Sequence, residues 1–203
     1  MNFWDKMEKK FGRYAIPNLS LYLILCFGCG YLLYAINPAM LNYLTLDPYK
    51  ILHGQIWRLF TWILIPGDGG SINIFTLIML FFYYSLGTAL ERTWGTYRYN
   101  VYIFSGMLFT IIGSFLCMGV AYLITGGMST EAASLVFYSG SYAFSTYYIN
   151  LSIFLAFAAT YPDMQVLLMF VIPVKVKWMG ILDAVLMIYT VIAGNLFTKF
   201  AVV

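Results

Sequence analysis

The sequence of residues 98–125 is RYNVYIFSGMLFTIIGSFLCMGVAYLIT, and beyond Arg98 it contains no charged residue. A helix needs roughly 20 consecutive apolar residues to cross the hydrocarbon core of a bilayer. We therefore predict that this run spans a membrane. Four other apolar runs, the third of them short, are predicted to be spans of the same bundle: residues 18–37, 72–93, 148–161 and 178–198.

The composition of the whole chain indicates a membrane domain. Of its 203 residues, 62% are hydrophobic and 9% are charged, whereas about a quarter of the residues in a soluble domain are charged. So few polar groups could not cover the surface of a domain folded in water. We predict an all-α, polytopic transmembrane helical bundle with no separate soluble domain. The net charge of +3 is too small to indicate a nucleic-acid partner, so the expected partner is the lipid bilayer.

The chain offers little that would bind a metal or a cofactor. Cys26 and Cys29 have the spacing of a metal or redox pair, but neither a second pair nor a neighbouring histidine accompanies them. We expect both to be small packing residues on the first span. No cofactor and no metal site is predicted.

Residues 1–16 are predicted to form an amphipathic, cytoplasmic segment ahead of a membrane domain of residues 17–203. Trp4, Met7 and Phe11 fall on one helical face, and the basic residues lie largely elsewhere. This pattern is typical of a short helix at a membrane surface.

The connections between the predicted spans differ in character. Residues 39–72 interleave charged and bulky apolar side chains, which predicts an interfacial loop partly sunk in the bilayer. Residues 126–147 are rich in Ser, Gly and Tyr and are expected to form a polar loop. Residues 164–178 are expected to re-enter the membrane face.

Positive charge near the spans indicates their orientation, because Lys and Arg accumulate on the cytoplasmic side. The tally favours a cytoplasmic N-terminus, expected here in a bacterial-type inner membrane, with the interfacial loop outside. The residues placed inside are Lys6, Lys9, Lys10, Arg13, Arg92, Arg98, Lys175 and Lys177, and those placed outside are Lys50, Arg58 and Lys199.

Several short motifs occur in a recognisable order. They are Trp57-Arg58 in the interfacial loop, Gly87, Glu91 and Gly95 around the end of the second span, and Pro162 and Pro173 after the fourth. With this topology, residues 17–190 resemble the rhomboid superfamily, which includes intramembrane serine proteases and derlin-like proteins that are not proteases. The resemblance implies a rhomboid-like membrane domain. The protease members have a sixth helix, and residues 199–203 are interpreted as part of a sixth span cut short.

The resemblance also implies a role for two charged residues. Arg58 matches an arginine that, in the family, is tied to the interfacial loop and to a glutamate at the end of the second helix, where Glu91 lies. The predicted topology places the two residues near opposite faces, which leaves direct pairing open. The alternative is that Arg58 extends to a lipid headgroup and that Glu91 is solvated.

The sequence departs from the protease members at the nucleophile. Those proteins carry a Gly-x-Ser-Gly motif at the start of the fourth helix, a position that falls near Tyr147 here, yet residues 141–160 contain no glycine. Ser145 and Ser152 therefore lack the flanking glycines that give a nucleophile room, and we predict no catalytic residue.

Other catalytic positions depart as well. Phe75 and Met79 occupy the places of the family's oxyanion-stabilising histidine and asparagine, and neither can donate a side-chain hydrogen bond. The only histidine, His53, lies in the interfacial loop.

Two intramembrane polar residues remain as candidates. An ionisable group inside a membrane is costly and by default suggests function. Asp183 is expected to line a wet cavity or to pair with Asn73 or Asn195; alternatively, it lies shallow, within reach of headgroups. Asn150 is expected either to cap the fourth helix or to face a cavity.

Small residues recur on two predicted helices and are expected to be packing surfaces, because close approach of backbones drives association in lipid. They are Gly106, Thr110, Gly113 and Cys117 on the third span and Ser152, Ala156 and Ala159 on the fourth.

Three functions follow as hypotheses. The first is a pseudoprotease that binds transmembrane segments of client proteins without cutting them, in quality control or trafficking. The second is an intramembrane serine protease with a noncanonical site, with Ser145 or Ser152 as the nucleophile. The third is a small transporter or channel that depends on Asp183.

Overall fold

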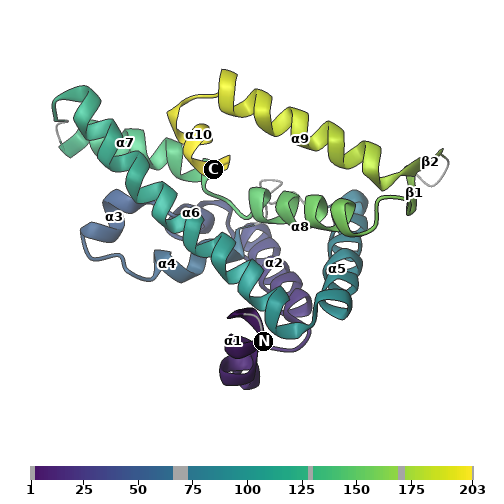
Figure 1. The fold of residues 1–203 in the computed structure, drawn as a ribbon. Coiled ribbons are helices and arrows are strands. Elements are labelled where there is room, and N and C mark those ends of the chain that lie inside the picture. The colour runs from purple at the N-terminus through teal and green to yellow at the C-terminus, as the bar shows by residue number, and fades with distance from the viewer. Residues whose placement is uncertain (1–2, 66–72, 128–129, 169–171, 203) are drawn as a thin grey trace.

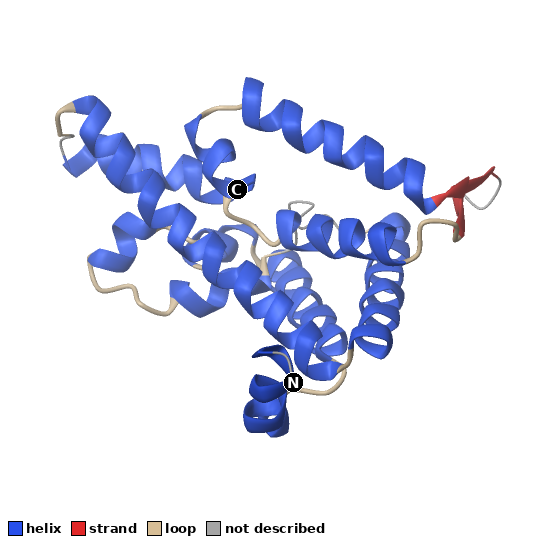
Figure 2. Cartoon of the chain, in the orientation of Figure 1, coloured by secondary structure: helices blue, strands red, loops and turns tan. Residues whose placement is uncertain are grey.

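The computed structural model describes residues 3–65, 73–127, 130–168 and 172–202. Nearly all of this part of the chain is helical (Figure 2), and five stretches are long and apolar enough to cross a membrane. These stretches are α2 (Leu19–Ile36), α5 (Ile74–Trp94), α6 (Thr96–Thr125), Glu131–Thr160 and α9 (Val176–Ala193). The predicted all-α, polytopic bundle is confirmed.

The bounds of the helices follow the sequence closely. Helices α2, α5, α6 and α8 (Tyr147–Thr160) each begin and end within two residues of their predicted limits. Local chemistry fixes some of these ends. The Asn73 side chain accepts a hydrogen bond from the Thr76 N–H at 2.9 Å and caps α5. Gly95, with a φ of 88°, ends α5 and begins the turn into α6.

Short elements complete the chain. They are α1 (Phe3–Phe11), the 3-10 turns η1 (Gly12–Tyr14), η2 (Pro38–Tyr43), η3 (Trp62–Leu64) and η4 (Ser141–Ala143), and the helices α3 (Pro48–Leu52), α4 (Arg58–Thr61), α7 (Thr130–Gly140) and α10 (Leu196–Val202). Of the predicted interfacial loop, residues 66–72 lie outside the described residues. From here on the name interfacial loop refers to residues 38–65, which contain η2, α3, α4 and η3. Figure 1 shows α1 extending below the bundle and α9 above α8.

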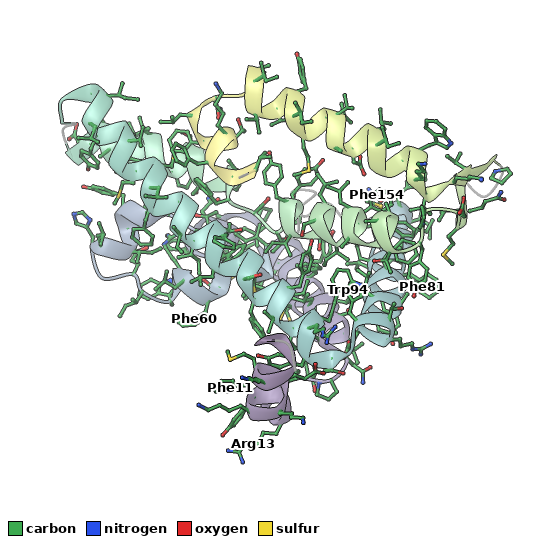
Figure 3. All side chains as sticks on the ribbon, viewed as in Figure 1. Phe11, Arg13, Phe60, Phe81, Trp94 and Phe154 are labelled. Carbon is green, nitrogen blue, oxygen red and sulfur yellow. The ribbon has the colours of Figure 1, made fainter. Side chains whose placement is uncertain are left out.

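The core lies where α2, α5, α6 and α8 meet the interfacial loop. Trp62 of the loop, Leu90 of α5 and Tyr99 of α6 are completely buried there. Large apolar side chains on the outer faces are exposed instead, such as Phe81 at 72% (Figure 3). In a bilayer such side chains contact acyl chains, so this outer surface needs no polar cover.

Helix α7 occupies half of the segment predicted to be a polar loop, residues 126–147, so that prediction was wrong. Ala133 and Phe137 lie four residues apart on one helical face and are buried against Ala121 of α6. The Phe137 ring also stacks on Tyr122 at a centroid distance of 5.9 Å. Burial of this apolar face explains the helix in spite of the flanking Ser and Gly residues.

A β-hairpin replaces the predicted re-entrant segment. Strands β1 (Gln165–Leu168) and β2 (Ile172–Lys175) pair antiparallel, with Gln165 opposite Lys175. Pro173 is tolerated in β2 because both strands of a two-stranded sheet are edges. In Figure 1 the hairpin projects from the bundle beside the start of α9.

Two glycines explain how the last helices pack. A Cβ on Gly180 of α9 would lie 2.6 Å from the Cβ of Ala158 of α8, and one on Gly113 of α6 would lie 2.8 Å from the Phe200 carbonyl oxygen of α10. The stripe on α6 is therefore a packing surface at Gly113 and at the buried Cys117, whereas nothing lies within 4 Å of a Cβ on Gly106. The apolar run interpreted as part of a sixth span is α10.

Candidate functional site

The N-terminal segment is fastened to one end of the bundle by a cluster of polar residues. We call this cluster the N-terminal junction; it consists of Ile16, Asn18, Ser20, Gly87, Glu91, Tyr99 and Asn100. Its side chains come from α2, α5 and α6, and they bind the main chain of Ile16 and Asn18, just ahead of α2.

Asn100 binds the main chain of Ile16 from both sides. Its Oδ1 accepts the Ile16 N–H at 2.9 Å, and its Nδ2 donates to the Ile16 carbonyl oxygen at 2.9 Å and to the Thr96 carbonyl oxygen at 2.8 Å. A buried asparagine with these partners fixes the position of residue 16 relative to α6.

Glu91 supplies the second contact of the junction. Its Oε1 accepts the backbone N–H of Asn18 at 2.9 Å. Asn18 has a φ of 55°, the left-handed conformation that asparagine tolerates better than most residues. The carboxylate also lies at the N-terminal end of α2, where negative charge is favourable.

Gly87 lies against a buried hydroxyl pair. Ser20 Oγ and the Tyr99 hydroxyl are 2.8 Å apart and hydrogen-bonded. A Cβ on Gly87 would be 2.2 Å from Ser20 Oγ and 2.6 Å from the Tyr99 hydroxyl oxygen. Glycine is therefore required for α5 to approach α2 and α6 at this level, as its place in the motif indicated.

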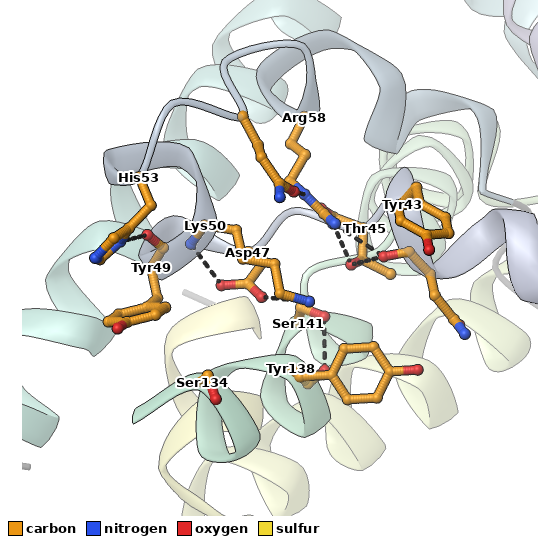
Figure 4. A network of polar contacts seen from close by, with 12 residues as sticks. Tyr43, Thr45, Asp47, Tyr49, Lys50, His53, Arg58, Ser134, Tyr138 and Ser141 are labelled. Atoms are coloured by element: carbon orange, nitrogen blue, oxygen red, sulfur yellow. Dashed lines mark hydrogen bonds and ion pairs between the residues drawn. The ribbon is translucent and has the colours of Figure 1, made fainter. Parts of the chain in front are cut away.

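A second polar network fills the interfacial loop and is centred on Arg58 (Figure 4). Arg58 is completely buried. Its Nε donates to Gln55 Oε1 at 2.7 Å, and its Nη1 donates to the carbonyl oxygens of Asn42 and Thr45 at 3.0 and 2.9 Å and to Thr45 Oγ1 at 3.0 Å. One guanidinium group thereby joins η2, the start of α3 and α4.

Asp47 supplies the negative charge of this network. It is completely buried, and its Oδ1 accepts the Lys50 N–H at 3.2 Å, which caps α3, while Oδ2 lies 3.7 Å from Lys50 Nζ. Burial lowers the pKa of the Arg58 guanidinium, and the nearby Asp47 carboxylate opposes that shift. Arginine titrates so far above neutral pH that it remains charged.

Arg58 and Glu91 do not pair. Arg58 contacts its own loop, whereas Glu91 lies near the far end of α5 and binds Asn18. The alternative of a headgroup-bound Arg58 and a solvated Glu91 was also wrong, because both side chains are buried. Each instead satisfies neighbouring backbone groups, which is how a charge is commonly accommodated in a protein interior.

The other motif residues are peripheral. Trp57 is half exposed, and its Nε1 donates to the Tyr43 carbonyl oxygen at 3.3 Å. Pro162 is exposed in the turn after α8, next to Tyr161, whose hydroxyl is hydrogen-bonded to Thr93 Oγ1 of α5.

Neither candidate serine is arranged as a nucleophile. Ser152 Oγ donates to the Ile149 carbonyl oxygen at 2.8 Å, within its own helix, and Ser145 Oγ accepts the Tyr147 N–H at 3.4 Å. His53 is exposed just after α3, and its Nδ1 contacts the Tyr49 carbonyl oxygen. Within the described ranges, no serine is hydrogen-bonded to a histidine, the contact on which nucleophile activation depends.

Asp183 lies on the inner face of α9, one turn beyond Gly180, and is half-buried. The partners expected for it are engaged elsewhere: Asn73 caps α5 and Asn195 Oδ1 accepts the Thr198 N–H at 2.9 Å. Asn150 is buried on the face of α8 that includes Phe154, rather than serving as the N-cap, which is Thr146.

A groove of about 580 Å³ lies between α5 and α8. Small side chains, Ser85 and Ala89, form its α5 wall, and Phe157 and Thr160 form its α8 wall. The turn at Tyr161–Asp163 closes one end. Metal ligands are not gathered anywhere in the part of the chain that the structure describes.

Sequence reasoning missed Tyr99, Asn100 and the loop acceptors Asn42 and Thr45. Asn100 carried a usable signal, because an asparagine in an otherwise apolar span needs polar partners. Two of the acceptors in the loop are the backbone carbonyl groups of Asn42 and Thr45, whose positions no residue pattern reveals.

Apolar helices that surround a buried polar loop define an integral membrane protein. The chain belongs to the family described as "Eukaryotic integral membrane protein (DUF1751)", whose model matches residues 20–202. No curated protein and no solved structure matches the chain. Because the family is eukaryotic, the expected bacterial-type inner membrane is not supported.

Proposed function

We propose that this chain is a rhomboid-like pseudoprotease that binds transmembrane segments of other proteins without cleaving them. The observation that carries the proposal is the groove between α5 and α8. It is lined by small and hydroxyl-bearing side chains, Ser85, Ala89 and Thr160. Such side chains let a foreign helix approach closely, and close approach is the main source of helix association in lipid.

Helix α9, which packs on α8, supports the same proposal. Only 11% of the most apolar window of α9 is buried, the lowest share of the five candidate spans. Most of its surface therefore faces lipid or a client helix. Asp183, half-buried on α9, would offer a charged partner to a polar group within the client segment.

The chemistry of the site supports binding rather than cleavage. Ser145 and Ser152 are bonded to neighbouring main-chain groups, and no histidine is bonded to either among the described residues. We further propose that the N-terminus is cytoplasmic. The eight basic residues counted for that side are all exposed and outnumber the three assigned to the opposite side, in keeping with the accumulation of Lys and Arg on the cytoplasmic side.

A photo-crosslinking experiment tests client binding. The full chain, carrying a photoactivatable residue at Ser85, is reconstituted in vesicles with single-span poly-leucine peptides that contain or lack a central Gly/Ser stripe. The matched control carries the same residue at Phe81, which is exposed on the same helix. We expect intact peptide to crosslink several-fold more from position 85, and more strongly when the stripe is present.

Equal crosslinking from both positions would contradict client binding in the groove. Release of a peptide fragment that depends on Ser145 or Ser152 would instead identify a protease.

A further inference from the structure

An apolar slot of about 400 Å³ runs along α6 from the N-terminal segment. On α6 it is lined by Tyr97, Val101, Phe104, Ser105 and Leu108, and Phe11, Tyr14 and Ala15 of the N-terminal segment close one end. The α6 positions are separated by three or four residues, so they form one continuous helical face.

The length of the slot matches one leaflet of a bilayer. From Tyr97 to Leu108 is eleven residues, or about 16 Å at the rise of an α-helix. The hydrocarbon core is roughly 30 Å thick. The slot therefore extends from the membrane surface, where α6 begins, to about the middle of the bilayer.

The interior of the slot offers little to a polar ligand. Ser105 Oγ already donates to the Tyr102 carbonyl oxygen at 2.8 Å, and the Asn100 side chain is engaged with Ile16 and Thr96. The large side chains Phe104 and Leu108 are about half exposed along the open side. In a membrane this side is in contact with acyl chains.

Positive charge lies at the mouth of the slot. Lys10 and Arg13 are both exposed, and they flank the lining residues Phe11 and Tyr14. The Arg13 guanidinium lies over the Tyr14 ring at 4.7 Å and donates to its hydroxyl at 2.6 Å, which holds the charge beside the slot. The nearest described acidic residue, Glu8, is paired with Arg98 at 3.5 Å.

We propose that this slot binds one anionic phospholipid, with an acyl chain along α6 and the phosphate at Lys10 and Arg13. An acyl chain suits the slot better than a client helix, because the α6 lining consists mostly of large side chains such as Tyr97, Phe104 and Leu108 and lacks the small residues that allow helices to approach closely. Basic residues next to a membrane favour anionic over neutral lipids. The proposal is independent of client binding in the groove between α5 and α8.

Native mass spectrometry of the full chain tests this site. The protein is released from nanodiscs that contain equal amounts of phosphatidylcholine and phosphatidylserine. We expect one retained lipid per chain, with a preference for phosphatidylserine on the order of tenfold. The double variant Lys10→Gln/Arg13→Gln should lose the preference while still retaining a lipid, and Val101→Trp, which fills the slot, should lose the lipid itself.

Two variants serve as matched controls. Lys177→Gln removes an exposed positive charge away from the slot, and Leu116→Trp enlarges an exposed side chain elsewhere on α6. Both should retain lipid as the wild type does. The proposal is overturned if the wild type shows no preference or if the preference survives Lys10→Gln/Arg13→Gln, whose side chains are exposed and do not contribute to the core.

Discussion

The Glu91 carboxylate accepts the backbone N–H of Asn18 at 2.9 Å and thereby connects the end of α5 to the start of α2. Replacement of Glu91 by leucine would leave this N–H without its acceptor in a partly buried site. We expect Glu91→Leu to lower the free energy of unfolding by about 1–3 kcal/mol. Glu91→Gln retains an acceptor oxygen and should cost less than half as much. Thermal unfolding in detergent measures both variants, and equal losses would show that the acceptor is unimportant.

Gly87 should not tolerate even one added methyl group. A Cβ at this position collides with the hydrogen-bonded Ser20 and Tyr99 pair, and overpacking of this kind costs about 1–3 kcal/mol. We expect Gly87→Ala to reduce the yield of monodisperse protein in size-exclusion chromatography and to lower its unfolding temperature. Gly106→Ala is the matched control, because nothing lies within 4 Å of the added Cβ. If the two variants have the same yield and unfolding temperature, α5 does not approach Ser20 and Tyr99 as closely at Gly87 as described.

The interfacial loop should depend on Arg58 more than on any other side chain in it. Arg58→Leu leaves the carbonyl oxygens of Asn42 and Thr45 without their donor and Asp47 with only the partly exposed Lys50 as a neighbouring cation. Breaking such a buried arrangement costs about 3–5 kcal/mol. Arg58→Lys keeps the charge but lacks the forked geometry that reaches Gln55, Asn42 and Thr45 together, so it should be intermediate. Limited proteolysis within residues 38–65 reports the loosening. Lys50→Gln removes a single ion pair at a partly exposed side chain and leaves the Arg58 hydrogen bonds in place, so it should loosen the loop less than Arg58→Leu does.

Serine-directed probes should fail to label this protein. A fluorophosphonate reacts with a serine that a base has activated, whereas Ser145 and Ser152 are bonded to main-chain groups of their own region. Gel fluorescence of the full chain in membranes checks this, beside an active rhomboid protease as a positive control. Labelling that disappears in Ser145→Ala or Ser152→Ala would identify that serine as a nucleophile and the protein as a protease.

Asp183 offers a test that separates stability from function. Leucine is favoured over aspartate at the centre of a membrane helix by about 3 kcal/mol on insertion scales, so Asp183→Leu should raise the unfolding temperature. If Asp183 also contributes to client binding, the same variant should crosslink fewer peptides from position 85. Asp183→Asn is the control that keeps a polar group of the same shape. Lower stability in Asp183→Leu would mean that Asp183 has a structural partner.

The sequence predicted the spans well because the physical requirement is simple. A membrane helix must be apolar over a fixed length, and its ends fall where that composition changes, as at Asn73 and Gly95. Helix α7 was missed because its apolar face, Ala133 and Phe137, is narrow and lies among serines and glycines. Packing of Phe137 against Tyr122 of α6, Tyr49 of α3 and Phe197 of α10 stabilises that segment as a helix.

The candidate site was less accessible to prediction. Arg58, Gly87 and Glu91 could be identified as structural residues from their order along the chain, but not the groups they bind. Arg58 binds the carbonyl oxygen of Thr45, and Glu91 binds the backbone N–H of Asn18. The positions of both groups depend on the path of the backbone. A residue pattern indicates the charge and size of side chains, but it does not predict where unpaired backbone carbonyl and N–H groups lie in the fold.

The two-sided hold of Asn100 on Ile16 has a mechanical consequence. Because one side chain grips both the N–H and the carbonyl group of residue 16, the peptide there can neither slide nor turn without release of both bonds. A force applied to α1 is therefore transmitted to α6 and is not taken up by a flexible linker. A bulky tag fused at the N-terminus would act on the bundle through the same two hydrogen bonds between Asn100 and Ile16.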